Sequence, residues 1–319
     1  MQLLALDFGG RHVKHCLMDE NLEITERGEF PAPLESADDF VQVIRDLYYE
    51  YDEVDGIAIS MPGVIDADTG YLYSAGVYTP LIGKTNLFDR IGVIGVPVSV
   101  ENDAKASVMA EAYYGSLQDV RDAACIIIGR ALGGGIVIDG RIRKGSHFAS
   151  GEISAMLRTA GNYERDNLAA RGASQSALLM LVAAAKGMAP AQFGVSTRIV
   201  KSEADPNLPI YSVDDVFKWI DEGDAQTCEA YRKWLANLVQ VIINLKMTID
   251  PEKIVLGGAI TRFERLLKDV QAEYDKSLPI MNYFGFPDVE LGICKFTADS
   301  HLVGAVANWM YHNSFAVDD

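Results

Sequence analysis

The sequence predicts an α/β protein with two lobes of related fold. A buried strand, a glycine turn, a second strand and a closing acid follow one another from Leu3 to Asp19. The same order returns from Ala123 to Asp139, a little over a hundred residues later. Self-similarity of this kind is typical of a duplicated domain. Strand-like and helix-like segments also alternate along the chain, as in α/β folds.

The first copy predicts a β-hairpin with a ligand-binding turn. Leu3–Leu6 and Val13–Met18 are the strands, and the turn at 7–11 contains Gly9 and Gly10. Glycine permits a positive φ and a close approach of the backbone to a ligand. One such turn is more often only a hairpin. Two in matching positions favour a pair of phosphate-binding turns that could close on a polyphosphate.

The segment between the two copies supplies a covering helix, a strand and a loop. Ser36 caps a predicted helix with Phe40, Ile44 and Leu47 on one face, which should cover one side of the sheet. Residues 54–61 form the next strand. The stretch 75–86 is turn-rich, and we expect a substrate loop there.

A strand meets a helix at Asn102 and Asp103. Apolar and polar residues alternate up to Val100, and strong helix formers run from Ala104 to Glu111. A carboxylate at the end of a strand can project into a cleft, so Asp103 is the candidate general base if the protein is an enzyme. Asn and Asp are also preferred helix N-caps, and that alternative stays open.

The remainder of the chain is mainly helical. A glycine pair at 257–258 follows a predicted strand at 253–256 and opens another helix, where an anion or a nucleotide can bind. We predict an N-terminal lobe at 1–115, joined by a C-terminal helix at 300–319, and a larger lobe at 116–299. The other predicted helices are 174–186, 213–221 and 224–249.

Composition excludes several classes of function. The 319 residues include 28 Lys and Arg against 45 Asp and Glu, a formal charge of −17 that disfavours nucleic acid as a partner. The longest apolar helical run, 177–185, is shorter than the ~20 residues that span a membrane. No basic signal segment opens the chain, so a cytoplasmic protein is expected. The four scattered cysteines indicate buried thiols, neither disulfides nor a zinc site.

Six motifs in order resemble the ROK family of sugar kinases and sugar-responsive proteins, within the actin-like ATPase (ribonuclease H-like) superfamily. The resemblance covers the whole chain and implies two such lobes with a cleft between them. The motifs are Asp7-Phe8-Gly9-Gly10, Pro62-Gly63, Glu101-Asn102-Asp103-Ala104, 132–140 from Leu132 to Gly140, Gly151-Glu152-Ile153, and 250–258 from Asp250 to Gly258.

The resemblance implies transfer of the ATP γ-phosphoryl group to a sugar hydroxyl, usually the 6-OH. Asp103 would accept the hydroxyl proton, and Asn102 and Glu152 would hold sugar hydroxyls. Gly63 and Gly76 are the other expected sugar contacts. Phosphoryl transfer needs little covalent help, so one carboxylate within reach of the hydroxyl is sufficient.

The same resemblance assigns the nucleotide site. Asp7 would organise Mg²⁺ through water, and no other metal is expected. The residues expected to bind ATP are Asp7, Gly9, Gly10, Arg11, Arg130, Gly133 and Gly134 at the phosphates and Gly257 and Gly258 at the nucleoside.

The chain departs from the family pattern at several positions. The family's zinc segment corresponds to 161–174, which has no cysteine, so a structural zinc is not expected. A sugar-contacting His is replaced by Ala155, and a second Glu by Ala170. Two threonines of the phosphate motifs are replaced by Arg11 and Arg130, which could pair with ATP oxygens, fill the ATP space or point to solvent.

We therefore expect a cytoplasmic, glucokinase-like sugar kinase, a homodimer acting on a hexose such as glucose or on a glycoside. The alternative is a catalytically impaired ROK protein that binds a sugar as a sensor or partner. A repressor is disfavoured because no DNA-binding segment precedes the first phosphate strand. Two minor groups are also placed: Tyr71, Tyr73 and Tyr78 as sugar-stacking or packing residues, and His12, His15 and His147 as structural or exposed residues.

Overall fold

The computed structural model describes residues 1–51, 54–193, 195 and 209–314. Contacts divide the chain into two compact units. Unit 1 contains 1–121, 135–151 and 295–319, and unit 2 contains 122–134 and 152–294. The lobes predicted at 1–115 and 116–299 remain a prediction. The units differ from them chiefly in that 135–151 belongs to unit 1.

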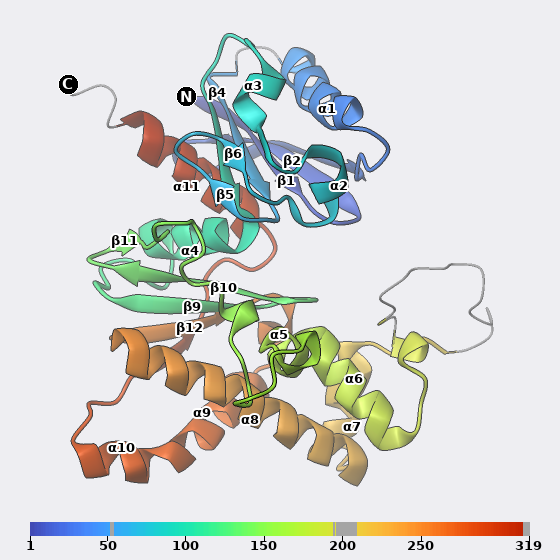
Figure 1. The fold of residues 1–319 in the computed structure, drawn as a ribbon, viewed down its shortest axis with the longest axis vertical. Helices are drawn as coiled ribbons and strands as arrows, with labels where there is room; N and C mark the ends of the chain where they lie inside the picture. Colours follow the sequence, from blue (N-terminus) through green and yellow to red (C-terminus); the bar gives the residue numbers. More distant parts are fainter. Residues whose placement is uncertain (52–53, 194, 196–208, 315–319) are drawn as a thin grey trace. The chain divides into compact units, whose positions relative to one another are not determined.

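The first sheet has the strand order β3-β2-β1-β4-β8. Its strands β1, β2 and β4 are labelled in Figure 1. β1 and β2 form an antiparallel hairpin, as predicted, and β3 extends it. β4 and β8 continue the sheet in parallel with β1. The strands are β1 Gln2–Phe8, β2 His12–Asp19, β3 Ile24–Pro31, β4 Gly56–Met61 and β8 Val98–Asn102.

The second sheet has the order β11-β10-β9-β12-β13, which corresponds strand for strand to the first. β12 and β13 continue it in parallel with β9. The repeated sequence pattern therefore does correspond to a repeated sheet. The strands are β9 Ala123–Ile128, β10 Leu132–Ile138, β11 Arg141–Ile142, β12 Lys253–Gly257 and β13 Glu290–Ile293. A small third sheet joins β5 Ile65–Asp66, β6 Tyr71–Leu72 and β7 Thr85–Asn86.

The first sheet is packed on both faces. Successive side chains of β1 point to opposite sides and enter two different core clusters. Leu4, Leu6 and Phe8 pack in the core cluster that includes the apolar face of α1. Leu3 and Ala5 pack in the cluster formed with α11. The predicted helix after Ser36 is α1, Ala37–Glu50, and the Ser36 side chain caps it as expected.

Close packing of two helices positions the strand-to-helix junction. α4 Asp103–Tyr114 lies against α11 Ser300–Ser314. A Cβ on Gly304 would come within 1.8 Å of the Ala106 carbonyl oxygen, so glycine permits this approach. The predicted final helix extended to 319; the structure describes it to 314. The short helices of unit 1 are α2 Thr79–Ile82 and α3 Leu87–Ile91.

Unit 2 is mainly helical after β11. The longest helix, α8, buries Trp234 completely, so this aromatic belongs to the core as predicted. None of the described helices is long and apolar enough to cross a membrane. The helices of unit 2 are α5 Ala170–Ala173, α6 Gln175–Lys186, α7 Val213–Asp221, α8 Ala225–Ile249, α9 Arg265–Tyr274 and α10 Leu278–Phe284.

Two local predictions were wrong. The glycine run 133–135 lies within β10, and only 129–131 connects the strands. A Cβ on Gly134 would meet the Cys125 carbonyl oxygen at 2.5 Å, so this glycine serves close packing. The glycine pair 257–258 opens only a 3-10 helix, Ala259–Arg262, and α9 starts at Arg265.

Candidate active site

Three polar residues occupy one row across the first sheet. Asp7 pairs in register with Ser60 on β4, and Ser60 pairs with Glu101 on β8. The Ser60 hydroxyl lies 3.4 Å from Asp7 Oδ1, and both Ser60 and Glu101 are fully buried. Two acids and a hydroxyl near the carboxyl ends of parallel strands are typical of a site, since ligands bind at that edge of α/β sheets.

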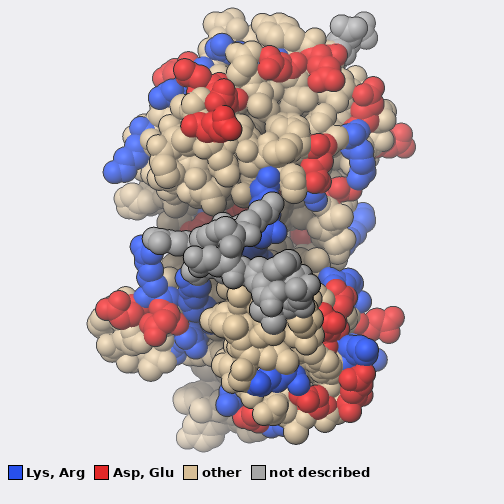
Figure 2. Space-filling model, turned by 90° about the vertical axis from the view of Figure 1, so that its right-hand side faces the viewer, with Lys and Arg blue, Asp and Glu red and all other residues tan. Residues whose placement is uncertain are grey.

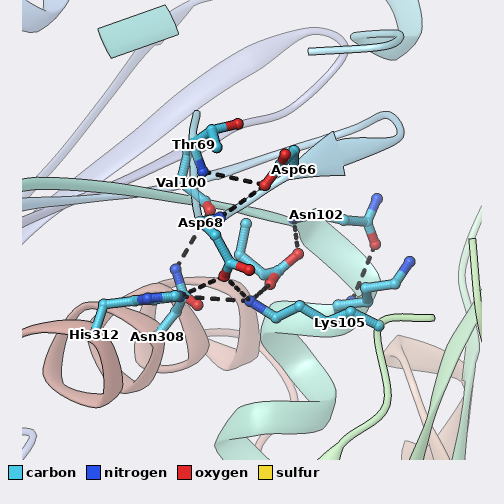
Figure 3. Close-up of polar contacts among 10 residues, drawn as sticks. Asp66, Asp68, Thr69, Val100, Asn102, Lys105, Asn308 and His312 are labelled. Carbon is cyan, nitrogen blue, oxygen red and sulfur yellow. Dashed lines mark hydrogen bonds and ion pairs between the residues drawn. The ribbon is translucent and has the colours of Figure 1, made fainter. Parts of the chain in front are cut away.

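The helix-cap alternative at the strand-to-helix junction falls on Asn102. Its side-chain oxygen accepts a hydrogen bond from the Lys105 backbone N–H, at 3.1 Å, and caps α4 (Figure 3). Asp103 is the first residue of the helix. Its Oδ1 accepts hydrogen bonds from the Ala104 N–H at 2.8 Å and the Asn102 amide at 3.1 Å. The structure shows no hydrogen-bond partner for Oδ2 among the described residues, so that oxygen is available to a ligand.

The three sugar contacts predicted in unit 1 lie together. The Asn102 amide donates a hydrogen bond of 2.9 Å to the Gly63 carbonyl oxygen. Gly63 has φ +132°, and a Cβ there would lie 2.1 Å from the Ser74 carbonyl oxygen. Gly76 has φ +55°, and its Cβ would meet Pro62 at 2.7 Å. Only glycine fits at these two positions. Gly63 lies beside Asn102, and Gly76 packs on the neighbouring Pro62.

Sequence reasoning missed His301, at the start of α11. Its Nδ1 lies 3.1 Å from Asp7 Oδ2. Burial lowers the pKa of His301, but the nearby Asp7 carboxylate, with Asp103 contributing, raises it above its ordinary value of 6.5 overall. Protonated His301 therefore forms an ion pair with the acid predicted to organise Mg²⁺. The histidine stands beside Ser300 in the sequence, and nothing local indicated a partner 294 positions away.

A hydrogen bond from an aromatic residue holds the first glycine turn in place. The Tyr78 hydroxyl donates a hydrogen bond of 2.7 Å to the Gly9 carbonyl oxygen. Tyr78 is fully buried against Phe8, so packing explains this tyrosine and not a sugar stack. A Cβ on Gly10 would make only ordinary contact with Val77, at 3.8 Å. Arg11 is exposed at the end of the turn.

The second glycine turn, 129–131 in unit 2, is held by the start of α6. Gln175 belongs to none of the sequence motifs. Its backbone N–H donates a hydrogen bond of 3.0 Å to the Gly129 carbonyl oxygen. Its side-chain amide bonds to the Ile128 carbonyl oxygen at 2.7 Å. Arg130 is exposed in this turn, and Gly133 is half-buried on β10. The turn is therefore anchored on both sides.

The other predicted residues of unit 2 lie on two separate segments. Gly258 has φ +95°, and a Cβ there would come within 2.4 Å of the Ile128 carbonyl oxygen. Gly257 packs equally closely on Ile127. Glu152 precedes a 3-10 helix, Ile153–Ala155, whose last residue stands where the family has its histidine.

A buried asparagine holds the loop where the resemblance places zinc. The Asn167 amide donates hydrogen bonds of 2.7 Å to the carbonyl oxygens of Thr159 and Asn162. Ala170, which replaces the family's second Glu, follows at the start of α5. No group of three metal-ligating side chains occurs among the residues that the structure describes.

A second polar cluster contacts the end of β8 at Glu101. Lys144 Nζ forms an ion pair of 3.0 Å with Glu101 Oε2 and lies 4.0 Å from Asp68. His312 lies 3.8 Å from Asp68 (Figure 3). It also lies 3.5 Å from Lys144. The other Glu101 oxygen accepts the Asn102 backbone N–H at 2.8 Å. The cluster therefore connects directly to the residues around Asp103.

Comparison with known proteins gives related kinases. An N-acetyl-D-glucosamine kinase of Vibrio parahaemolyticus is 25% identical over 285 residues, 86% of this chain and 89% of that protein. A β-glucoside kinase of Listeria monocytogenes is 24% identical over 311 residues, 97% and 98% of the two chains. The crystal structure of a ROK family protein from Streptococcus pneumoniae in complex with sucrose matches with a TM-score of 0.83 at 23% identity, covering 99% and 100%.

These neighbours confirm the predicted α/β fold. The pattern that defines the ROK family matches residues 3–311, nearly the full length of the chain. The order of motifs from Asp7 to Gly258, the duplicated sheets and this match agree. The chain belongs to the ROK family.

Proposed function

We propose that the protein is an ATP-dependent carbohydrate kinase with Asp103 as general base. One observation carries this proposal: Asp103 Oδ1 is held by the Ala104 N–H and the Asn102 amide, while Oδ2 has no partner among the described residues. Two hydrogen bonds to one oxygen orient this carboxylate at the helix start, and they leave its second oxygen able to accept a proton. The names of the related kinases support the same class of reaction.

In the proposed reaction, a sugar hydroxyl oxygen attacks the γ-phosphorus of ATP. The bond from this phosphorus to the β–γ bridging oxygen breaks, ADP leaves, and the hydroxyl proton passes to Asp103 Oδ2. Asn102, Gly63, Gly76 and Glu152 would orient the sugar. Such positioning, with charge stabilisation, supplies most of the catalysis in phosphoryl transfer.

The glycine segments fit the phosphates of ATP. The turn at Gly9 and Gly10 presents backbone without side chains, and the exposed Arg11 beside it adds a cation whose planar fork suits phosphate oxygens. Mg²⁺ bound with the nucleotide would neutralise phosphate charge, with Asp7 as its partner through water. The remaining proposed contacts are Arg130, Gly133 and Gly134 for phosphates and Gly257 and Gly258 for the nucleoside.

The proposed substrate is a hexose such as glucose, phosphorylated at the 6-OH, or a glycoside. The related kinases are named for N-acetyl-D-glucosamine and β-glucosides, so both belong in any substrate panel. The replacement of two family contacts by Ala155 and Ala170 indicates a specificity different from that of members which use them. We also propose a cytoplasmic homodimer.

The test is ATP consumption with Mg²⁺ and a panel of hexoses, amino sugars and β-glucosides. Asp103→Asn should lower turnover by about 10²–10⁴-fold, the usual contribution of a general base. Asp139→Asn is the matched control, since it makes the same change at an exposed acid whose φ of +53° asparagine tolerates. Equal turnover in the Asp103→Asn protein and the wild type would refute the assignment.

A sugar-binding protein without kinase activity is the second candidate, favoured by the Asp7–His301 ion pair and by the arginines in the two turns. In that case a sugar raises the melting temperature, no sugar stimulates ATP consumption, and calorimetry detects no ATP binding. Restored ATP binding in the double variant Arg11→Thr, Arg130→Thr would assign the loss to the arginines.

A further inference from the structure

Unit 1 contains a pocket outside the predicted sugar and nucleotide residues. Its volume is about 520 Å³, within the range of small-molecule sites. The walls come from the end of α4 at Tyr113, from α11 at Tyr311, and from β11 and the loop that follows it, 141–148. All of these segments belong to unit 1.

The pocket is basic, although the chain is acidic. Arg141, Arg143 and Lys144 line it, against one acid, Asp68. Neither arginine forms an ion pair with any residue in the described part of the chain, whereas the nearby Arg121 pairs with Asp139. Asp and Glu outnumber Lys and Arg by 45 to 28, and acidic and basic side chains are interspersed on the face shown in Figure 2. Two exposed guanidinium groups that pair with no acid in the described part of the chain suit an anionic ligand.

The aromatic wall suits a ring that carries hydroxyl groups. The Tyr113 and Tyr311 rings lie 6.2 Å apart, and Phe148 closes part of the pocket. The Tyr113 hydroxyl is buried without a hydrogen-bond partner among the described residues. Burial raises the pKa of Tyr113, which keeps this hydroxyl protonated as a donor. The ring faces of aromatic residues suit the apolar face of a sugar.

Lys144 connects the pocket with the candidate catalytic residues. It lines the pocket and pairs with the buried Glu101 at 3.0 Å. Glu101 in turn accepts the backbone N–H of Asn102, which caps α4 and touches Asp103. An anion in the pocket would compete with Glu101 for Lys144 and so disturb the position of Asp103.

We propose that this pocket binds a sugar phosphate monoester, with the phosphate on Arg141 and Arg143 and the sugar ring against Tyr113 and Tyr311. Occupancy lowers the activity by drawing Lys144 from Glu101. The regulatory part rests on the proposed kinase function, whereas the binding part does not. A sugar phosphate is the class of molecule that the proposed reaction produces, so the pocket would provide feedback by product.

The binding test is calorimetry on the full chain with glucose 6-phosphate, glucose and inorganic phosphate as probes. We expect glucose 6-phosphate to bind more tightly than inorganic phosphate when both are titrated in the presence of saturating glucose. The double variant Arg141→Gln, Arg143→Gln should weaken it about tenfold or more, because charge-assisted hydrogen bonds are lost. Arg121→Gln, an exposed arginine outside the pocket, is the control and should bind as wild type does.

Three outcomes would overturn the binding part. These are displacement of glucose 6-phosphate by glucose, unchanged affinity in the double variant, and affinity for inorganic phosphate equal to that for glucose 6-phosphate. For the regulatory part, glucose 6-phosphate should inhibit wild-type turnover and lose this effect in the double variant, with the KM for the sugar unchanged. Absence of turnover with every sugar would count against the kinase, while the calorimetry would still decide on the site.

Discussion

The two copies of the sheet carry residues of different polarity at one matched pair of positions. In the first, Asp7 on β1 pairs in register with Ser60 on β4. In the second, Ile127 on β9 pairs with Gly257 on β12. Both pairs lie one residue before the last residue of the first strand of a hairpin. The same backbone therefore carries polar groups in one sheet and an apolar side chain with a glycine in the other.

The difference indicates that matched positions of the duplicated sheets have different roles. The polar row of the first sheet continues to Glu101 and then to Asn102 and Asp103 on the same strand and the next helix. The glycine of the second sheet allows tight packing, since a Cβ on Gly257 would lie 2.7 Å from Ile127 and 2.8 Å from Cys294. The acid and hydroxyl at these positions of the first sheet therefore have no polar counterpart at the matched positions of the second.

The largest effect on stability is expected at the ion pair behind the polar row. Lys144→Met removes the partner of Glu101, whose side chain is only 1% exposed. An uncompensated buried charge destabilises strongly, so the free energy of unfolding should fall by about 3 kcal/mol. Urea denaturation at pH 7 measures this difference.

The double variant Lys144→Met, Glu101→Gln tests the cause. Because it removes both charges, it should recover most of the lost stability, giving a large coupling energy in the double-mutant cycle. Additive losses would mean that packing of the lysine stem, and not charge, explains the single variant.

An exchange of residues between the two rows is the next test. Gly257→Ser places a side chain where Ile127 and Cys294 already lie, and we expect a loss of about 2 kcal/mol from overpacking. Ser60→Ala in the first sheet should change stability by less than about 1 kcal/mol, since the bond to Asp7 is long, at 3.4 Å. Similar losses in both variants, measured by urea denaturation, would contradict the distinction between the rows.

A smaller loss of stability is expected when the indole hydrogen bond of a tryptophan is removed, in either unit. Trp234 donates to the Ser174 carbonyl oxygen at 2.8 Å, and Trp309 donates to the Pro97 carbonyl oxygen at 3.0 Å. Substitution of either by Phe removes the donor, and each should cost about 1 kcal/mol. Thermal unfolding of both variants gives the comparison. A loss confined to one of them would show that the two bonds are not equivalent.

Periodicity and glycine patterns were sufficient for most of the fold. The alternation in β1, the face of α1 and its Ser36 cap are local signals, which is why the duplicated sheets could be predicted. Asn102 and Asp103 were placed at the junction for the same reason. Which of the two residues caps the helix required the structure, because it depends on which side-chain oxygen meets which backbone N–H.

The missed residues depend on contacts that are distant in the sequence. His301 meets Asp7 across nearly the whole chain, and Lys144, in the loop after β11, meets Glu101 at the end of β8. The glycines at 133–135 were misplaced because glycine indicates both a turn and a close packing contact. No local pattern separates the two.

The smallest effect concerns the pH dependence of stability through His301. Its raised pKa means that the protonated form stabilises the fold. This contribution is fully present below the ordinary value of 6.5 and is lost as the pH rises through the raised value. The His301 side chain is 33% exposed, so solvent screening limits the gain to less than about 1 kcal/mol.

His301→Asn should therefore be less stable than wild type at pH 6, and the difference should shrink by pH 9. Urea denaturation at the two pH values measures it, with His12→Asn, at an exposed histidine 3.6 Å from Glu29, as control. A difference that is the same at both pH values would mean that the charge on His301 contributes nothing to its pairing with Asp7.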